Sequence, residues 1–175
     1  MSTAATGDER GTSRAGFREL ARAAARAEAR GDGSALLREF LLLCAAGDAY
    51  AVPVERVREI VRLRPITPIP RAPHAIRGVV ALRGDMIEVV DLRRRLGLPD
   101  DEPGRAQRIV VLHGAEGEAT GLLVDAASDV LRVEESALGP PPAGEAGAVV
   151  ALCAWQERFV SVLDVDRVLD LGAAG

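Results

Sequence analysis

The feature of this sequence that most constrains its fold is an internal repeat at a shift of 70 residues, from 51 to 121. Residues 51–62 align without a gap with residues 121–132, and each segment consists of an apolar run, an acidic residue and further apolar positions. The acids at the matching position are Glu55 and Asp125. A chain that repeats its pattern at a fixed interval is built from similar structural units, so we interpret the body of this protein as a tandem duplication.

The same register extends to other parts of both copies. Residues 79–82 and 149–152 both read Val-Val-Ala-Leu. Asp91 and Asp164 each follow the last apolar run of a copy and precede a short amphipathic stretch. That is the position of a helix N-cap, so the repeat predicts a short capped helix at the end of each copy.

Short apolar runs separated by Gly- and Asp-containing turns predict small β-barrels rather than a βαβ sheet. Eight such runs are residues 40–44, 50–53, 79–82, 86–90, 109–112, 121–124, 149–152 and 159–163. Each copy is expected to hold about five strands, with a short helix after the second strand and another after the last. The predicted fold class is mainly β: two five-stranded barrels, a crossover at residues 98–103, and a groove between the barrels as a natural place for a partner.

The first of these helices is predicted at residues 55–61. Its apolar positions have helical spacing and would enter the core: Val54, Val57, Ile60 and Val61. The residues left outside are charged: Arg56, Arg58, Glu59 and Arg62. Such a face is ordinarily solvated, and a surface that binds a partner is the alternative.

Residues 1–38 differ from the rest and are interpreted as an N-terminal arm that precedes a body at residues 39–175. Residues 17–30 are dominated by the helix formers Ala, Arg and Glu, but Phe17 and Leu20 are their only large apolar members. A helix with so little to bury is marginal on its own. We expect a flexible arm with a helical tendency, and a docking helix for a partner is the alternative.

The composition restricts the possible classes of function. The net charge is −4 and aromatic residues make up 3% of the chain, whereas a barrel that binds single-stranded nucleic acid needs a basic groove with aromatic stacking platforms. We therefore expect no nucleic-acid partner. No apolar run approaches the ~20 residues that span a bilayer, and residues 1–14 have no apolar signal-peptide core. The expected location is the cytoplasm, without membrane insertion.

Motifs for catalysis or metal binding are absent from the sequence. His74 and His113 have no Cys or His partner at ligand spacing, and no serine lies in a Gly-x-Ser-x-Gly elbow. Cys44 and Cys153 each lie in an apolar run, which favours buried free thiols over a disulfide or a metal pair. We expect no enzyme activity, no cofactor and no metal.

Two Arg-Gly pairs, Arg77-Gly78 and Arg83-Gly84, flank the strand predicted at residues 79–82. Glycine lets a partner approach the backbone, and arginine offers a planar head with several donors that suits carboxylates. The simpler interpretation of Arg83-Gly84 is a hairpin turn with a solvated arginine. Composition alone leaves both interpretations open.

These segments together resemble the CheW family. Its opening strand-and-helix signature, proline-rich loop, central motif and second-half motif have counterparts here in the same order, at residues 50–60, 66–73, 76–93 and 121–131. Four motifs in order make the resemblance specific. It extends from about residue 40 to residue 171 and does not include the arm.

The resemblance implies two intertwined SH3-like barrels in a non-enzymatic adaptor, with possible assembly into rings or arrays. The implied partners are the regulatory domain of a CheA-type histidine kinase and the cytoplasmic tip of a methyl-accepting chemoreceptor, whose helix would lie in the groove between the barrels. The kinase would contact apolar patches at the barrel ends. By motif match, the receptor-binding residues would be Val57, Glu59, Gly78, Arg83, Gly84 and Val130.

The sequence also departs from the family pattern. Ala81 stands where the family usually has Asn, and Glu88 stands where it usually has Pro. Trp155 lies in a longer turn than usual, either as an exposed interface anchor or packed against its own barrel. Glu88 and Trp155 are therefore candidate specificity residues. The departures keep open a chemosensory pathway other than flagellar chemotaxis, and a spacer or decoy that binds the kinase and has lost the receptor.

Overall fold

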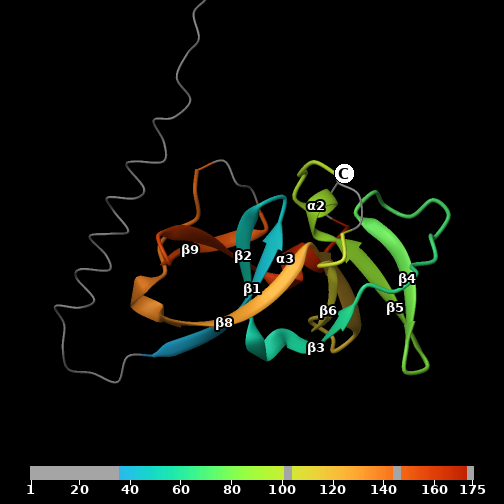
Figure 1. Cartoon of the computed structure of the whole chain (residues 1–175), viewed down its shortest axis with the longest axis horizontal. Helices are drawn as coiled ribbons and strands as arrows, with labels where there is room; N and C mark the ends of the chain where they lie inside the picture. The colour runs from blue at the N-terminus through green and yellow to red at the C-terminus, as the bar shows by residue number, and fades with distance from the viewer. Residues whose placement is uncertain (1–35, 101–103, 144–146, 173–175) are drawn as a thin grey trace, which may run out of the picture.

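The computed structural model describes residues 36–100, 104–143 and 147–172. Its strands form two five-stranded sheets, each curved into a small barrel, and the two barrels lie side by side (Figure 1). The strands of the first copy are β1 (Leu37–Ala45), β2 (Asp48–Pro53), β3 (Val57–Arg62), β4 (Ile76–Leu82) and β5 (Asp85–Asp91). Those of the second copy are β6 (Arg108–His113), β7 (Ala119–Val124), β8 (Ala126–Glu134), β9 (Val149–Trp155) and β10 (Arg158–Leu163).

The two copies exchange strands. Barrel A has the strand order β8-β1-β2-β10-β9, and barrel B has the order β3-β6-β7-β5-β4. Each barrel therefore takes two strands from one copy and three from the other. The parallel pair of each barrel, β2 with β10 and β5 with β7, joins one copy to the other. This arrangement confirms the predicted fold class of two intertwined five-stranded barrels.

All eight predicted strands are present, and the repeated caps are where the sequence places them. The Asp91 carboxylate accepts hydrogen bonds from the amides of Arg93 and Arg94 at the start of α2 (Leu92–Arg95). The Asp164 carboxylate accepts one from the amide of Arg167 in α3 (Val165–Leu169). Each satisfies amide groups that a helix start leaves unpaired.

The helix predicted at residues 55–61 is wrong. A single 3-10 turn, η1 (Val54–Arg56), is followed by strand β3, and Ile60, which the prediction placed in the core, is 44% exposed. Exposure alternates with a period of two along the strand. The β-branched residues at 57, 60 and 61 suit a strand, and β6 offers hydrogen bonds along its edge, so tertiary pairing overrides the helical spacing.

The same correction applies to the second copy. Its predicted helix is strand β8, which pairs with β1, and a 3-10 turn, η2 (Glu135–Ala137), follows it. The arm predicted at residues 1–38 lies outside the described residues up to residue 35, and Leu37 already belongs to β1.

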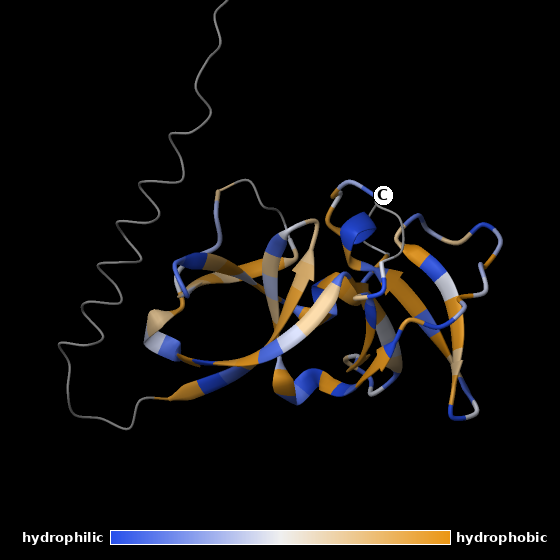
Figure 2. Cartoon of the chain, viewed as in Figure 1, coloured by the Kyte–Doolittle hydropathy of each residue, from blue (hydrophilic) through white to orange (hydrophobic). Residues whose placement is uncertain are grey.

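Three apolar clusters form the core. One fills barrel A around Phe40, one fills barrel B around Ile109, and the largest lies between the barrels and draws on both sheets. Strand β1 is buried on both faces: Phe40 and Leu42 point into barrel A, and Leu41 and Leu43 point into the middle cluster. Continuous apolar strands are visible in both barrels (Figure 2), because a strand buried on both faces has no polar side.

Charged groups tie the barrels together around the middle cluster. Asp125, between β7 and β8, accepts hydrogen bonds from the Arg93 guanidinium at 2.6 Å and from the Ala46 amide at 2.8 Å. Arg95 of α2 donates to the backbone carbonyls of Val168 and Arg167 in α3. These contacts fix the relative position of the barrels, and with it the shape of the junction. No helix in the described parts of the chain is long and apolar enough to cross a membrane.

Both cysteines are free thiols, and they differ in exposure. Cys153 is fully buried in barrel A, and this burial raises its pKa to about 11, whereas Cys44 is half-buried. At pH 8 the Cys153 sulfur is therefore a shielded thiol rather than the reactive thiolate. We expect iodoacetamide to label the native protein at Cys44 alone and both cysteines in denaturant, as read by peptide mass mapping. Equal native labelling rates would contradict this.

Candidate functional site

The residues predicted for receptor binding lie mainly around the junction of the barrels. Val57 and Glu59 are on β3, the edge strand of barrel B, and Val130 is on β8, the edge strand of barrel A. β8 also contacts β6, the neighbour of β3. The two edges therefore flank the junction.

Cross-strand partners show which way the edge residues face. Val130 lies opposite Leu41, and Ile60 lies opposite Val110; both partners belong to the middle cluster. Opposite residues in antiparallel strands share a face, so Val130 and Ile60 extend the apolar middle cluster outward on the two walls of the junction. Val130 is 54% exposed, and Val57 packs against the same cluster. Exposed β-branched residues on two edge strands form a candidate contact surface.

A surface hollow of about 590 Å³ opens beside these walls. It is lined by residues of β1, η1 and β8, namely Leu37, Arg38, Glu39, Val54, Glu55 and Arg132. Charge pairs cross it, because Arg132 donates to Glu39 at 2.7 Å and Arg38 lies 3.8 Å from Glu55. We call this hollow, together with the walls carrying Val57, Ile60 and Val130, the junction groove.

Arg83 and Gly84 form the two-residue turn between β4 and β5. Both have positive φ, +52° and +93°, as a tight hairpin of this kind requires. The Arg83 guanidinium donates to the Glu59 carboxylate on β3 at 3.1 Å. Arg83 is 78% exposed at its side chain and Glu59 is 21% exposed. Arg83 is thus in a hairpin and paired, and its charged head lies at the surface beside an edge strand.

Gly78 differs from the other predicted residues because it is buried against the chain itself. A Cβ at this position would lie 2.1 Å from the carbonyl oxygen of Thr67. Thr67 and Val79 exchange backbone hydrogen bonds at 2.9 Å, so the chain before β4 runs directly over this glycine. The close backbone approach at Gly78 is therefore made by the protein's own loop.

Arg56 fixes the start of β3. Its guanidinium donates to the His113 carbonyl at 2.7 and 2.9 Å and to the carboxylate of Asp166 in α3. The hydrogen bond with Asp166 raises the pKa of Arg56, and the same bond lowers the pKa of Asp166. The pair holds η1 against α3, which orients the edge strand that carries Val57 and Glu59.

The two candidate specificity residues lie away from the junction groove. Glu88 is half-buried on β5 opposite Val79. Trp155 ends β9, is half-buried and packs against the apolar cluster of barrel A. The longer turn predicted around Trp155 is wrong, because β9 continues to Trp155, which pairs with Arg158, and the turn holds only residues 156 and 157. Of its two predicted arrangements, Trp155 adopts the one packed on its own barrel.

Sequence reasoning missed Ile60 as a surface residue, since the helical interpretation placed it in the core. Exposed and half-buried positions alternate along β3 only in the structure; the sequence signal for a strand is the β-branched residues at 57, 60 and 61. Within the described residues, no group of three His, Cys, Asp or Glu side chains is placed to hold a metal ion.

Comparisons with known proteins agree with the fold. The family model described as CheW-like domain matches residues 39–172. The chemotaxis protein CheW of Rhizobium meliloti (strain 1021) is 31% identical over 135 residues, which cover 75% of this chain and 86% of the relative. The protein of the same name from Bacillus subtilis (strain 168) is 33% identical over 128 residues, covering 71% and 81%.

A solved structure has the same architecture. It is the scaffolding protein TtCheW from Thermoanaerobacter tengcongensis, which superposes with a TM-score of 0.72 at 25% sequence identity. The match covers 78% of this chain and 94% of that chain.

Proposed function

The chain belongs to the CheW-like domain family and is a chemotaxis coupling adaptor, and from that premise we propose that it joins a chemoreceptor tip to a CheA-type histidine kinase without catalysing a reaction. The receptor tip would lie in the junction groove, and the kinase regulatory domain would bind an apolar patch at a barrel end. The proposed location is the cytoplasm, at receptor arrays.

The arrangement of the junction groove supports this proposal. A receptor tip is a helical coiled coil, and a helix binds a groove through apolar anchors flanked by polar contacts. Val57, Ile60 and Val130 supply apolar walls, and the Arg83–Glu59 pair supplies charge beside β3. Gly84 adds no side chain to the tip of the β4–β5 hairpin, and Gly78 leaves room for the Thr67 backbone to pack against β4.

The proposed mechanism is placement. Receptor and kinase bind different surfaces of one rigid pair of barrels, so a change in receptor conformation alters the contacts that bias the kinase. Each interface is proposed to be modest, with repeated binding in an array supplying stability. The alternative of a kinase-binding spacer is not favoured, because the two relatives described above are named chemotaxis protein CheW.

The exposed Arg83–Glu59 pair is the single observation that carries the receptor assignment, and reversing its charge tests it. In Arg83→Glu two carboxylates would face each other beside β3. We expect receptor affinity to fall ~10- to 100-fold, or about 1.4–2.8 kcal/mol, because the contact surface loses a cation and gains a carboxylate. Stability should change by less than ~1 kcal/mol, since exposed ion pairs contribute little. Receptor-dependent kinase activation and calorimetric titration with the receptor tip measure these effects.

Arg158→Glu is the matched control, because it makes the same reversal on the exposed end of β10 in barrel A. It should leave receptor affinity unchanged. If Arg83→Glu retains full receptor-dependent control of the kinase, Arg83 is not a receptor-binding residue. Kinase binding should persist in both variants, so a loss of kinase binding in Arg83→Glu would also contradict the assignment.

A further inference from the structure

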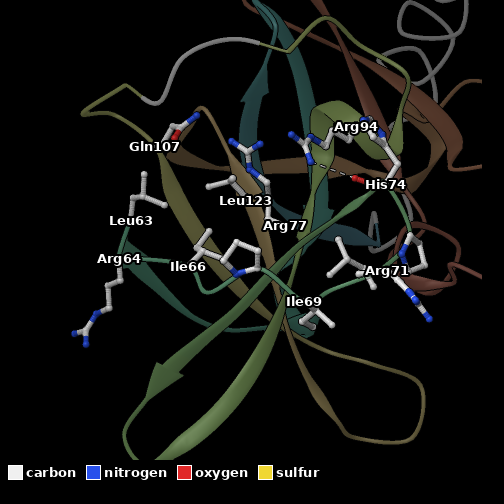
Figure 3. A pocket seen from close by; sticks show the side chains of 14 residues that line it. Leu63, Arg64, Ile66, Ile69, Arg71, His74, Arg77, Arg94, Gln107 and Leu123 are labelled. Atoms are coloured by element: carbon white, nitrogen blue, oxygen red, sulfur yellow. Dashed lines mark hydrogen bonds between the residues drawn. The ribbon is translucent and has the colours of Figure 1, made fainter.

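A second recess lies on barrel B, at the opposite end of β3 and β4 from Val57 and Arg83. It has a volume of about 630 Å³, within the ~300–1,000 Å³ range of ligand pockets. The loop between β3 and β4 forms much of its wall, and α2 and the residue before β6 complete it (Figure 3). We call it the barrel B pocket. Its polar members are Arg64, Arg71, His74, Arg77, Arg94 and Gln107.

The pocket is cationic in a chain whose net charge is −4. Arg77 and Arg94 extend toward the same end of the pocket as Gln107, whereas Arg64 and Arg71 point outward at two sides of the rim (Figure 3). Arg77 lies 3.5 Å from Asp91, and Arg94 lies 3.2 Å from Asp100.

Among the described residues, no carboxylate forms an ion pair with Arg64 or Arg71. Within this part of the chain, the two positive charges at the rim of the pocket are therefore not neutralised by an ion pair. A recess with an uncompensated charge of one sign attracts ligands of the other sign.

Gln107 gives an independent sign of a missing ligand. Its side chain is 7% exposed, and its Oε1 has no hydrogen-bond partner among the described residues. A buried acceptor without a donor costs ~1–3 kcal/mol, and natural proteins seldom keep one without a use. Gln107 lines the pocket beside Arg77, and its Oε1 is shielded from solvent, so a ligand donor reaches it only when neighbouring side chains move aside.

The remaining wall is apolar. Ile66 and Ile69 come from the loop between β3 and β4, Leu63 follows β3, and Leu123 comes from β7. Ile69 is 37% exposed although it is a large hydrophobic residue. A small inorganic anion would bind the arginines, but it would leave the apolar side chains uncovered and the Gln107 oxygen without a hydrogen-bond donor. The occupant must carry a carboxylate, an N–H donor and an apolar group together.

We propose that the barrel B pocket binds an acidic peptide segment of a partner protein. Carboxylates of the segment pair with Arg64 and Arg71, a backbone N–H of the segment donates to Gln107 Oε1, and an apolar side chain covers Ile66 and Ile69. The pocket is distinct from the junction groove, so this contact is additional to receptor binding and does not depend on it.

Fluorescence anisotropy with the full chain and a labelled peptide of alternating Glu and Leu tests the proposal. In Arg64→Gln we expect ~10-fold weaker binding, the loss of one charge-assisted hydrogen bond. Gln107→Leu keeps the shape of the side chain and removes the unpaired oxygen. It should bind the peptide more weakly and also unfold at a higher temperature, a combination that a purely structural glutamine would not give.

Arg158→Gln is the matched control, because it removes the same charge from barrel A, and its affinity should equal that of the unchanged chain. A peptide with Lys in place of Glu should not bind, and millimolar inorganic phosphate should compete only weakly. The proposal is overturned if the Lys peptide binds equally well, if phosphate displaces the peptide completely at that concentration, or if Arg64→Gln binds normally. A Gln107→Leu chain that unfolds at a lower temperature would assign the amide to the fold and overturn its binding role.

Discussion

The first copy alone, residues 36–100, is expected to remain unfolded as a monomer. Barrel A needs β8, β9 and β10, and barrel B needs β6 and β7, all of which belong to the second copy. The isolated copy retains only the hairpins β1–β2 and β4–β5. Isolated two-stranded hairpins are marginal at best in water, so neither half-barrel can support itself.

Separating the copies also removes the packing of the middle cluster, in addition to the pairing of strands. The middle cluster joins Leu41 and Leu43 of the first copy to Val110, Leu112 and their neighbours in the second. In a separate copy these side chains would face water. Each buried Leu or Val contributes ~1.5–3 kcal/mol when removed from water, and a small domain has only ~5–15 kcal/mol of net stability.

Circular dichroism and urea titration of the two separate copies, 36–100 and 104–172, would measure this. Each alone should show no cooperative transition, and a mixture at equal concentration should regain β structure and a transition that depends on protein concentration. The intact chain is the control. A cooperative transition from a monomeric single copy, with the monomer shown by sedimentation, would refute the exchange of strands. If each copy instead formed a barrel from its own strands alone, each separate copy should fold and unfold cooperatively.

The repeat in the sequence predicted two units but not which strands share a barrel. Matching runs at a fixed shift are equally compatible with two separate barrels and with two exchanged ones, because pairing between edges depends on contacts distant in sequence. The intertwined arrangement came from the resemblance to a family. Particular residues show the same limit: the apolar residues at 57, 60 and 61 have helical spacing, whereas in strand β3 the adjacent Ile60 and Val61 face opposite sides.

The residues of the candidate sites were also only partly predictable from the sequence. Arg83, Glu59 and Val130 were identifiable by motif match, but the 3.1 Å contact between Arg83 and Glu59 needs the β4–β5 turn to reach β3. Ile60 became a candidate only when its exposure was visible. Nothing in the local sequence around Gln107 marks it, because the barrel B pocket assembles residues from the loop after β3 and from β4, α2 and β7.

Replacing Gly78 with alanine is expected to lower the free energy of unfolding by ~3–5 kcal/mol, from overpacking and backbone strain together. The added Cβ would lie 2.1 Å from the Thr67 oxygen and 2.6 Å from its carbonyl carbon, far inside contact distance. Both are backbone atoms held by the paired hydrogen bonds with Val79, so they cannot move aside without breaking the bridge. The φ of +143° adds strain for any residue with a side chain.

Gly84→Ala separates these two contributions. Gly84 also has positive φ, +93°, but a Cβ there would meet nothing within 4 Å. It should therefore lose only the strain component, ~1–2 kcal/mol. Urea titration gives both values, and thermal melting should place the Gly78→Ala midpoint ~10 °C or more below that of the unchanged chain. Equal losses in the two variants would show that contact with Thr67 does not constrain Gly78.

Loss of receptor affinity in Gly78→Ala can mean either that Gly78 contacts the receptor or that it only supports the fold of barrel B. The loop over Gly78 carries Ile66 at 2.9 Å from the added Cβ, and Ile66 lines the barrel B pocket. Gly78→Ala should therefore weaken peptide binding there as well as destabilise barrel B, whereas a residue that only contacts the receptor would leave that pocket intact. Measuring both affinities at a temperature where the variant is still folded distinguishes a supporting role from a direct contact. Loss of receptor affinity with normal pocket binding and normal stability would identify Gly78 as a contact residue and contradict the supporting role proposed here.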